Sequence, residues 1–293
     1  MTLNLLIPVY NNYKGVIDTL MSLNTYNCHH NIQIIIINDS STDNKDYNEI
    51  INLFKYWYNI KLLNTPYNMG AGGARQYGLN HVTSDYVMFI DAGDIIYSPI
   101  EFIEYLNFID ENPKTLFFSP AHFEQGENGI CTVCGSNNNR LHGKVYHYSL
   151  FKEYKIKFNA VCTNMNEDIG FNMMCRYVCK YLNYINPSVD YCIEYELPIV
   201  VWTFSLDSLT RQDNYAFYYK QNTGLGIHSV YAIEFALSHN IPFELIQYDV
   251  YDVFIHLYIF YISTLNERPE YLQESFDGAL YFYTNILVKY PMN

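Results

Sequence analysis

Two carboxylates, Asp91 and Asp94, lie close together directly after the apolar residues 86–90. Carboxylate oxygens are the ligands that hard divalent cations such as Mg²⁺ and Mn²⁺ prefer. A cation bound there would neutralise a diphosphate and stabilise it as a leaving group. The same pattern also suits a loop whose aspartates cap the following helix. We therefore predict Asp91 and Asp94 as candidate ligands of Mg²⁺ or Mn²⁺.

A third carboxylate, Asp39, follows four consecutive isoleucines and Asn38. An acidic side chain at the carboxyl end of a strand is well placed to accept a hydrogen bond from a base imide or a ribose hydroxyl. The alternative is that Asp39 caps a helix beginning near Asp43, a role for which the intervening hydroxyl residues compete. We predict that Asp39 binds a nucleoside.

Residues 70–75 read Gly-Ala-Gly-Gly-Ala-Arg and predict a helix that is entered through glycines. The backbone N–H groups of such a helix start can bind phosphate, and Arg75 can donate to a base or a phosphate. The segment is not a dinucleotide-binding fingerprint, because its sixth position is arginine and it does not follow the first predicted strand. A flexible helix entry is the alternative.

Glu167 and Asp168 stand at the start of an amphipathic helix predicted over residues 168–182. A carboxylate that projects from this helix start could remove a proton from an acceptor hydroxyl. The helix dipole would keep Asp168 ionised at neutral pH. The alternative is that the two acidic residues only cap the helix. We predict Asp168 as the candidate general base.

The elements that must position these residues alternate through the first half of the chain. Apolar runs predict strands at residues 3–9, 32–37, 60–63, 86–90 and 116–118, and helical spacing predicts helices at residues 13–23, 43–57, 71–81 and 99–109. This alternation implies an α/β fold with a mostly parallel sheet flanked by helices. Ligands of such sheets bind beyond the carboxyl ends of the strands. Because Asp39, Asp91 and Asp94 follow such ends, we expect them along one edge of the sheet.

The second half of the chain is less regular. Residues 124–140 are rich in Gly and Asn and predict a loop or a hairpin, and residues 197–204 predict a strand. From about residue 230 onward the pattern is mostly helical and strongly aromatic. We therefore expect a C-terminal helical extension of the α/β fold.

Charge and composition exclude several classes of function. Seventeen basic against thirty acidic residues give a formal net charge of −13. That field repels a phosphate backbone, so we expect no nucleic-acid partner. No uninterrupted apolar stretch reaches about 18 residues, so no membrane span is predicted. The seven cysteines are odd in number and no secretory signal is evident, so we expect reduced thiols and a cytoplasmic location.

Cys131 and Cys134 have the spacing of a pair of zinc ligands, with His142 and His147 as candidate further ligands. No second cysteine pair with this spacing follows in the chain. The alternative is a hairpin that carries two free thiols, and the sequence leaves both readings open.

Several motifs, in order along the chain, resemble those of family-2 glycosyltransferases with the GT-A fold. The resemblance covers roughly residues 3–222, and the ordered set is far more specific than any one motif. The motifs are Leu6-Ile7-Pro8-Val9-Tyr10-Asn11, Ile36-Ile37-Asn38-Asp39-Ser40-Ser41-Thr42-Asp43, Asn68-Met69-Gly70 with Ala74-Arg75, Phe89-Ile90-Asp91-Ala92-Gly93-Asp94, His142-Gly143-Lys144-Val145-Tyr146, Ile156-Lys157-Phe158 and Glu167-Asp168.

The resemblance implies an enzyme that transfers a sugar from a nucleotide-sugar, typically a UDP-sugar, to an acceptor hydroxyl. The acidic composition, with 31 tyrosines, suits a carbohydrate or protein acceptor, because aromatic faces stack on sugars. The resemblance implies a divalent metal and inversion at the anomeric carbon. It also implies that residues 218–222 close the donor site, and His228 is a weaker candidate metal ligand. The implied roles are nucleotide contacts at Pro8, Tyr10, Asp39, Arg75 and Asp91, metal contacts at Asp91 and Asp94, and a catalytic base at Asp168.

The same resemblance divides the chain into three parts. Residues 1–112 would form the nucleotide-sugar-binding subdomain, and residues 113–228 the acceptor-binding and catalytic subdomain. The C-terminal helical region, residues 229–293, matches nothing in the family pattern. Its aromatic helices could pack on the catalytic domain, form a homodimer or hold an acceptor.

The sequence departs from the family pattern at three positions. Asn38 and Ser40 replace the usual Asp and Gly around Asp39, and Gly93 occupies the third position of the usual Asp-x-Asp. This last change leaves open which oxygens hold the metal.

Two other functions compete with the transferase. A sugar-1-phosphate nucleotidylyltransferase would carry a glycine-rich loop directly after the first strand, whereas the first glycine here is Gly15. A non-catalytic nucleotide-sugar-binding relative is disfavoured, because Asp39, Asp91, Asp94 and Asp168 are all present.

Overall fold

The computed structural model describes residues 1–24, 28–137, 139–159, 166–205 and 215–290, without the side chains of residues 215–221. The strands are β1 (Thr2–Val9), β2 (Asn31–Asn38), β3 (Asn59–Asn64), β4 (Tyr86–Phe89), β5 (Ile95–Ile96), β6 (Phe117–Gln125), β7 (Cys131–Cys134), β8 (Val145–His147) and β9 (Cys192–Trp202). The α-helices are α1 (Tyr13–Leu23), α2 (Asn48–Phe54), α3 (Gly70–Leu79), α4 (Pro99–Glu111), α5 (Ser149–Tyr154), α6 (Glu167–Ile185), α7 (Tyr215–Ser238), α8 (Gln247–Glu267) and α9 (Leu272–Phe282). Short 3₁₀ turns lie at Phe243–Leu245 and Pro269–Tyr271, and a π turn at Tyr283–Leu287.

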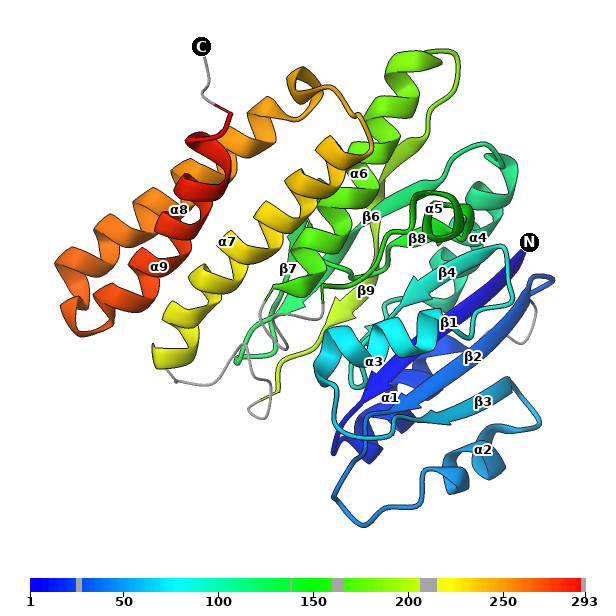
Figure 1. Cartoon of the computed structure of the whole chain (residues 1–293). Helices are drawn as coiled ribbons and strands as arrows, with labels where there is room; N and C mark the ends of the chain where they lie inside the picture. The colour runs from blue at the N-terminus through cyan, green and yellow to red at the C-terminus, as the bar shows by residue number, and fades with distance from the viewer. Residues whose placement is uncertain (25–27, 138, 160–165, 206–214, 291–293) are drawn as a thin grey trace.

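The strands form one sheet in the order β3-β2-β1-β4-β8-β6-β9-β5, with β7 paired to β6 (Figure 1). The first four strands are parallel, as predicted. Beyond β4, the pairs β4–β8 and β8–β6 are antiparallel, so the second half of the sheet is mixed. The structure therefore confirms an α/β fold with helices on both faces and a C-terminal helical extension.

Side chains of β1 alternate between two apolar cores. Leu6 belongs to the core beneath α3 and α6, whereas Leu5 and Ile7 belong to the core beneath α1 and α4. The period of two in a strand sends successive side chains to opposite faces, which is why residues 5–9 of this strand are all apolar. Each such Leu or Ile contributes about 1.5–3 kcal/mol when it is fully buried.

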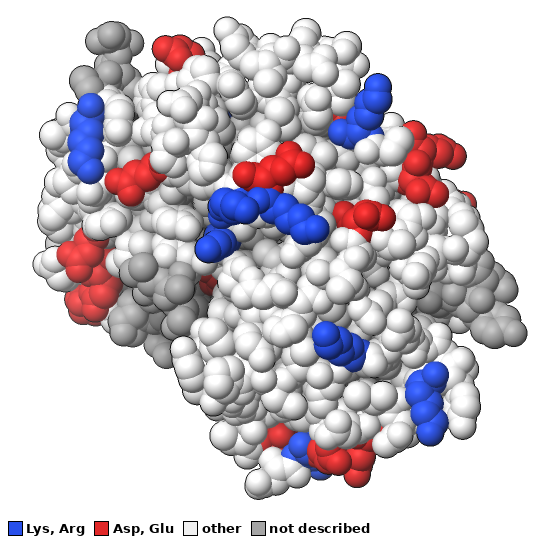
Figure 2. All heavy atoms as spheres, turned by 45° about the vertical axis from the view of Figure 1, so that its right-hand side comes forward, with Lys and Arg blue, Asp and Glu red and all other residues white. Residues whose placement is uncertain are grey.

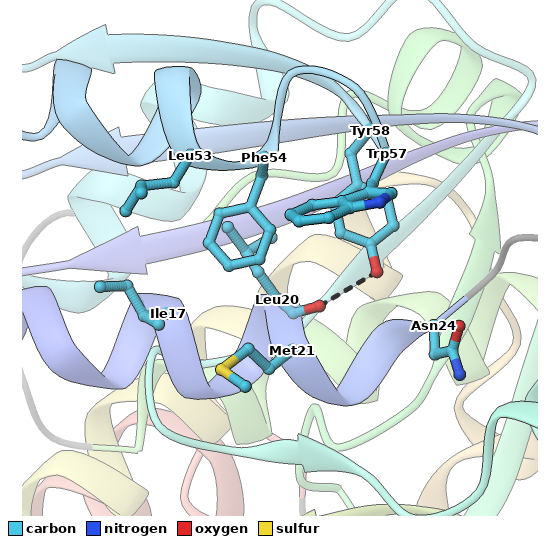
Figure 3. A pocket seen from close by; sticks show the side chains of 8 residues that line it. All are labelled: Ile17, Leu20, Met21, Asn24, Leu53, Phe54, Trp57 and Tyr58. Carbon is cyan, nitrogen blue, oxygen red and sulfur yellow. Dashed lines mark hydrogen bonds between the residues drawn. The ribbon is translucent and has the colours of Figure 1, made fainter.

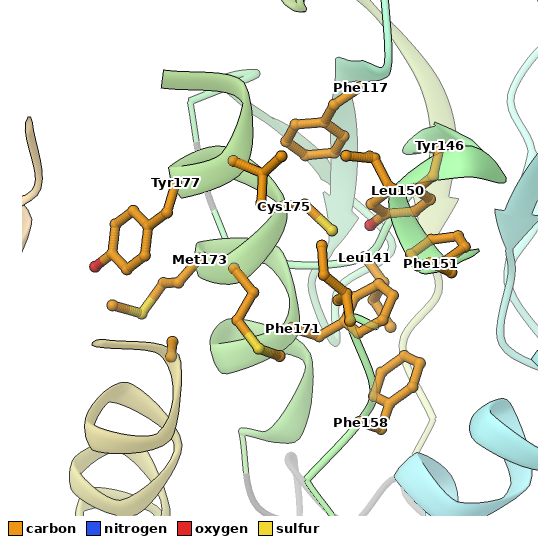
Figure 4. Close-up of a cluster of buried hydrophobic side chains, with 14 of the residues drawn as sticks. Phe117, Leu141, Tyr146, Leu150, Phe151, Phe158, Phe171, Met173, Cys175 and Tyr177 are labelled. Atoms are coloured by element: carbon orange, nitrogen blue, oxygen red, sulfur yellow. The ribbon is translucent and has the colours of Figure 1, made fainter. Parts of the chain in front are cut away.

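Aromatic rings fill the core beneath α6 (Figure 4). Phe158 stacks on Phe171 of α6 with ring centroids 4.0 Å apart, and Phe117 stacks on Tyr146 at 5.1 Å. Aromatic pairs of this kind contribute about 0.5–1.5 kcal/mol beyond the burial of their area. This packing holds the first turns of α6 against the sheet, and that first turn carries Glu167 and Asp168.

The C-terminal helices pack on the rest of the protein through α7, which lies along α6 (Figure 1). The backbones of α7 and α9 approach closely, since a β-carbon at Gly226 would lie 2.5 Å from the Gly278 carbonyl oxygen. Of the three roles expected for this region, packing on the preceding part of the chain is observed, because α7 contacts α6. The predicted boundary between residues 228 and 229 falls inside the continuous helix α7.

The helix predicted over residues 43–57 is wrong in length, because α2 covers only Asn48–Phe54. Residues before α2 form other hydrogen bonds. The Asp43 side chain accepts from the Tyr47 hydroxyl (3.0 Å), and the Asn11 side chain accepts from the backbone N–H of Thr42 (2.6 Å). Short polar side chains that bond in this way compete with helix formation. β5 could not be predicted from the sequence, because a strand of two residues is too short to show an alternation of apolar and polar residues.

An apolar pocket of about 470 Å³ lies between α1 and the segment that links α2 to β3 (Figure 3). Ile17, Met21, Leu53 and Trp57 are among its lining side chains. None of the predicted site residues lines it. The pocket is therefore separate from the carboxylates at the carboxyl ends of the strands.

On the face shown in Figure 2, basic side chains are scattered, some beside acidic ones and others among uncharged residues. Lys144, from the most basic stretch of the sequence, is fully buried and adds nothing to the surface charge. Within the described residues, no helix combines the length and the apolar composition that a membrane crossing requires.

Candidate active site

The loop after β4 is a tight turn that carries Asp91 and Asp94. Its closing hydrogen bond runs from the Asp94 N–H to the Asp91 carbonyl (3.0 Å), and Gly93 has a φ of +105°, which favours glycine. Asn12, at the start of α1, donates to one carbonyl of the turn (2.7 Å), and Thr203, just after β9, donates to the next (2.8 Å). The turn is therefore fixed from two sides.

Arg75, on α3, is buried and bridges two carboxylates. Its Nη2 donates to both oxygens of Asp91 (2.7 and 2.9 Å), and its Nη1 donates to Glu167 Oε1 (2.7 Å). Partial desolvation opposes ionisation of Asp91, but the Arg75 charge outweighs it and lowers the pKa of this carboxyl. Because the guanidinium is already paired with two carboxylates, its contact with a base or a phosphate stays a prediction.

Glu167 belongs to the candidate site through its ion pair with Arg75, a contact that the sequence does not predict. It is buried at the start of α6 and meets Arg75 from 92 positions away in the chain. Gly72 makes room for it, since a β-carbon at Gly72 would lie 2.7 Å from the Glu167 Cγ. Gly72, one of the glycines predicted to bind phosphate, thus makes room for a carboxylate side chain. A glycine at this position is the sequence feature that could indicate the close approach of another side chain.

Asp168 is partly buried in the first turn of α6, where its Oδ1 accepts a hydrogen bond from the Ile169 N–H (2.9 Å). Burial and the charge of Glu167 raise the pKa of Asp168 to about 6, while Arg75 acts in the opposite direction. At this pKa the carboxyl is mostly ionised at pH 7. Burial raises the pKa, whereas the helix dipole would lower it. A pKa just below neutrality suits a general base.

Asp39 lies at the carboxyl end of β2 and is buried. Its Oδ1 accepts hydrogen bonds from the Thr65 hydroxyl (2.9 Å) and the Met69 N–H (2.8 Å), which join β2 to the segment before α3. The alternative that Asp39 caps the next helix is wrong, because the N-cap residue of α2 is Tyr47.

Asp94 is buried beside a histidine that sequence analysis had assigned to a different site. Its Oδ1 accepts the Thr203 N–H (3.0 Å), and its Oδ2 lies 3.4 Å from His142 Nδ1. Among the described residues, Oδ2 accepts no hydrogen bond of ordinary geometry. Burial raises the pKa of Asp94. A buried carboxylate oxygen whose one nearby basic group is an imidazole at 3.4 Å is a suitable ligand for a cation.

The predicted edge of the sheet is present. β1 lies between β2 and β4 and is parallel to both, so the carboxyl ends that lead to Asp39 and Asp91 lie at the same edge, on either side of the end of β1. At the end of β1, Pro8 is buried and Tyr10 is exposed, which places Tyr10 at the surface of this edge. Pro8 and Tyr10 as nucleotide contacts stay predictions.

The described residues do not form the candidate zinc site. Cys131 and Cys134 lie on β7, which forms a hairpin with β6, as the alternative predicted. His147 instead contacts the Ser149 hydroxyl (2.7 Å), and His142 faces Asp94. Within the described chain, only His29, His30 and Asp110 form a cluster of three candidate metal ligands. His30 directly precedes β2, so that cluster lies at the opposite ends of the strands from Asp91 and Asp94.

Two further predictions concern α7. The side chains of residues 218–221 lie outside the described residues, whereas Asn222 is buried and donates to the Ser275 carbonyl (2.9 Å). His228 is buried where α7 meets α6, since a β-carbon at Gly170 would lie 2.9 Å from the His228 Cβ. Its role as a metal ligand stays a prediction.

The model of one protein family, described as Glycosyl transferase family 2, matches residues 5–180, which is more than half of the chain. The chain belongs to glycosyl transferase family 2. The matched residues of this family-2 chain include Pro8, Asp39, Asp91 and Asp168, whereas residues 218–222 and His228 lie outside the match. This membership favours the transferase over the nucleotidylyltransferase.

Curated relatives of the family-2 chain are also glycosyltransferases. An uncharacterized glycosyltransferase of Rickettsia conorii is 32% identical over 127 residues, 43% of this chain and 20% of the relative. The amylovoran biosynthesis glycosyltransferase AmsB of Erwinia amylovora is 34% identical over 92 residues, 31% of this chain and 30% of the relative. A dolichyl-phosphate beta-glucosyltransferase of Trichomonas vaginalis is 36% identical over 97 residues, with the same coverage of 31% and 30%. The chain thus matches at most 30% of the length of these three relatives.

Solved glycosyltransferases share the GT-A fold of the family-2 chain. S. aureus TarS (1–349) in complex with UDP has a TM-score of 0.57 at 16% identity. The match covers 80% of this chain and 70% of the TarS chain. The mannosyltransferase PcManGT from Pyrobaculum calidifontis, in complex with GDP-Man and Mn²⁺, has a TM-score of 0.52 at 10% identity. That match covers 99% of this chain and 88% of the PcManGT chain.

Proposed function

We propose that the chain is a glycosyltransferase that moves a sugar from a nucleotide-sugar, with UDP as the favoured nucleotide, to an acceptor hydroxyl. The Arg75 bridge carries the proposal, because it ties Asp91 after β4 to the start of α6, where Asp168 lies. A fixed separation between the donor site and the base favours a displacement reaction. Family membership supports the same reaction, and the fold shared with a UDP complex supports UDP.

Asp39 is the proposed uridine-binding residue. Its Oδ1 is held by Thr65 and Met69, and its Oδ2 accepts no hydrogen bond among the described residues. A carboxylate that is held through one oxygen can accept the imide N–H of a uracil with the other. Pro8, Tyr10 and Arg75 are the proposed further contacts with the nucleotide, since they lie on the same edge of the sheet.

Asp94 is proposed to hold a divalent cation, Mn²⁺ or Mg²⁺, with Asp91 nearby. The fit rests on Asp94 Oδ2, which is buried and faces only the His142 ring, at 3.4 Å, among the ion pairs of the described residues. The cation, when bound, would stabilise the charge that develops on the departing diphosphate. The Mn²⁺ in the complex of PcManGT supports such a requirement.

In the proposed transfer, the acceptor oxygen attacks the anomeric carbon and its proton passes to a carboxylate oxygen of Asp168. The bond from the anomeric carbon to the diphosphate oxygen breaks, and its electron pair leaves with UDP. Attack opposite to the leaving group inverts the configuration at this carbon. The pKa of Asp168, about 6, allows the carboxylate to accept the proton at neutral pH.

Asp168→Asn tests the proposal, because it removes the base and keeps the size of the side chain. Transfer should fall by about 100-fold or more, while the affinity for UDP in calorimetry should stay close to that of the wild type. Asp190→Asn is the matched control, since it removes an exposed carboxylate beyond α6 and should leave both values unchanged. Transfer by Asp168→Asn at the wild-type rate would refute the assignment of the base.

The donor can be identified by a hydrolysis screen across UDP-, GDP- and dTDP-sugars. Hydrolysis of a UDP-sugar, together with UDP binding that strengthens in the presence of Mn²⁺, is the expected result. Calorimetry with UDP, with and without Mn²⁺, separates this reaction from turnover of UTP with a sugar phosphate. That turnover would instead indicate the nucleotidylyltransferase.

The acceptor proposed for this enzyme is a carbohydrate or a protein, and not a nucleic acid. The net charge of −13 supports the exclusion of nucleic acids. A cytoplasmic location is also proposed, supported by the free thiols of the six described cysteines. A homodimer through the C-terminal helices is supported by Tyr248, Tyr251 and Tyr258, which are exposed on α8.

A further inference from the structure

His142 occupies a defined position in a tight turn before β8. The Lys144 N–H donates to the Leu141 carbonyl (3.1 Å), and Gly143 has a φ of +71°. This hydrogen bond and the positive φ at the third residue are the features of a type II turn, with His142 at the second position. A β-carbon at Gly143 would lie 3.0 Å from a side-chain carbon of Pro120, so the turn fits closely against β6.

Two rings hold the imidazole of His142 in place. Trp202, at the end of β9, stacks on it with centroids 5.1 Å apart and planes at 24°, and His122 of β6 packs at 4.7 Å. The His142 side chain is only 12% exposed. Its Nδ1 is directed at Asp94 Oδ2, at 3.4 Å, and the ring also interacts electrostatically with Asp91 and Asp168. The imidazole therefore lies beside Asp94, and its charge acts on the other two carboxylates of the candidate site.

The side-chain oxygens of Asp94 and Asp91 differ in their hydrogen-bond partners. Both oxygens of Asp91 accept hydrogen bonds from Arg75, so a cation on Asp91 would lie next to a guanidinium. Asp94 Oδ2 has no such donor among the described residues, and the only basic group that the structure records within 4 Å of it is the His142 ring. Electrostatic repulsion thus disfavours Asp91 as the main ligand.

We propose that Asp94 Oδ2 and His142 Nδ1 together bind the divalent cation of the proposed transfer, and that the imidazole makes the site select Mn²⁺ over Mg²⁺. Two ligands that lie about 2.1 Å from one ion, at angles of about 90–110°, are about 3.0–3.4 Å apart, close to the observed separation. Imidazole nitrogen suits transition metals, whereas Mg²⁺ prefers oxygen ligands. The role of this cation in the transfer rests on the proposed function, whereas the arrangement of Asp94 and His142 does not depend on it.

The first test is a spectroscopic measurement on the wild-type chain. Mn²⁺ is added with and without UDP, and pulsed electron paramagnetic resonance is used to detect coupling between the Mn²⁺ electron spin and a directly bound ¹⁴N nucleus. The proposal requires this coupling in the wild type. Loss of the coupling in His142→Phe, which keeps a ring to stack on Trp202, would assign it to His142. His122→Phe is the matched control, since it keeps a ring packed against His142, removes only the nitrogens of the neighbouring imidazole and should retain the coupling.

The second test compares cation affinities. His142→Phe should weaken Mn²⁺ binding by about 10-fold or more and should weaken Mg²⁺ binding much less, because the lost ligand is a nitrogen. His122→Phe should preserve the preference for Mn²⁺. The affinity of all three proteins for UDP without metal should be similar, since Asp39 does not touch His142. Thermal unfolding of each variant checks that it is folded.

The outcomes separate this inference from the proposed function. Absence of ¹⁴N coupling in the wild type, or unchanged Mn²⁺ affinity in folded His142→Phe, would overturn the assignment of His142 even if UDP binds normally. Mn²⁺ binding with ¹⁴N coupling that depends on His142, but without any UDP binding, would support the cation site and refute the proposed function.

Discussion

Arg75 and Glu167 are 92 positions apart in the chain, yet Arg75 Nη1 lies 2.7 Å from Glu167 Oε1 and each side chain is only 7% exposed. The contact joins α3, which follows the first three strands, to α6, which carries Asp168. A buried charge that loses its partner is costly, because neither water nor another group can replace that partner. The pair therefore links the stability of the fold to the geometry of the proposed reaction.

Arg75→Met should lower the free energy of unfolding by about 3–5 kcal/mol, because it leaves Glu167 buried without a counter-charge. The half-exposed Asp91 should contribute little to this loss, since water can solvate it. Adding Glu167→Leu should recover part of the loss, because the unpaired charge is then removed. Urea unfolding measures both effects. A single variant within about 0.5 kcal/mol of the wild type would show that the bridge does not stabilise the fold.

Glu167→Gln should move the acidic limb of the pH–rate profile to lower pH. In the wild type, kcat/KM should fall as the pH drops through about 6, because Asp168 becomes protonated and can no longer act as a base. The negative charge of Glu167 is one cause of this raised pKa, so its removal favours the ionised form of Asp168 and lowers the pKa. Glutamine keeps an oxygen that can accept from Arg75.

Glu111→Gln is the control for this profile, since it removes an exposed charge at the end of α4 and should leave the limb in place. A limb that stays near pH 6 in Glu167→Gln would show that Glu167 does not affect the titrating group. A limb that moves to higher pH would contradict the proposed sign.

The edge that carries Asp39, Asp91 and Asp94 could be predicted from the sequence. Alternating strands and helices imply a parallel sheet, and the carboxyl ends of neighbouring parallel strands must meet at one edge. The observed order, with β1 between β2 and β4, confirms that argument for Asp39 and Asp91.

The contacts between the two halves of the chain could not be predicted in this way. His142 reaches Asp94 because the three-residue strand β8 inserts antiparallel beside β4, and so short a strand shows no period in the sequence. Glu167 meets Arg75 only because α6 packs over the sheet. Both contacts depend on tertiary packing across long separations, about which local spacing carries no information.

Gly72→Ala should impair transfer although alanine favours helices. The helix propensity of alanine would add about 1 kcal/mol at an unhindered site in α3. The new β-carbon would lie 2.7 Å from the Glu167 Cγ, and the displaced side chain would strain its bond to Arg75. A fall in kcat of about 10-fold, or more, is expected from a shift of this kind. Gly135→Ala is the control, since its β-carbon meets no described atom within 4 Å.

Asp39→Asn should weaken UDP binding by about 10- to 100-fold, as expected for the loss of a hydrogen bond to a charged group. Asparagine can still accept from Thr65 and Met69 through one oxygen, but its amide would then place a donor where Oδ2 faces the base. Thr65→Val keeps the carboxylate and removes only the hydroxyl that positions it, so its loss should be smaller, about 2- to 10-fold. Thr132→Val, on the exposed strand β7, should leave UDP affinity unchanged.

Calorimetry with UDP in the absence of metal ranks these variants, because the contribution of the cation is then removed. If Asp39 binds the base, the affinities must fall in the order wild type, Thr65→Val, Asp39→Asn. A Thr65→Val protein that binds UDP less tightly than Asp39→Asn would mean that Asp39 only anchors the loop before α3. The nucleoside would then be recognised by another residue at the same edge of the sheet.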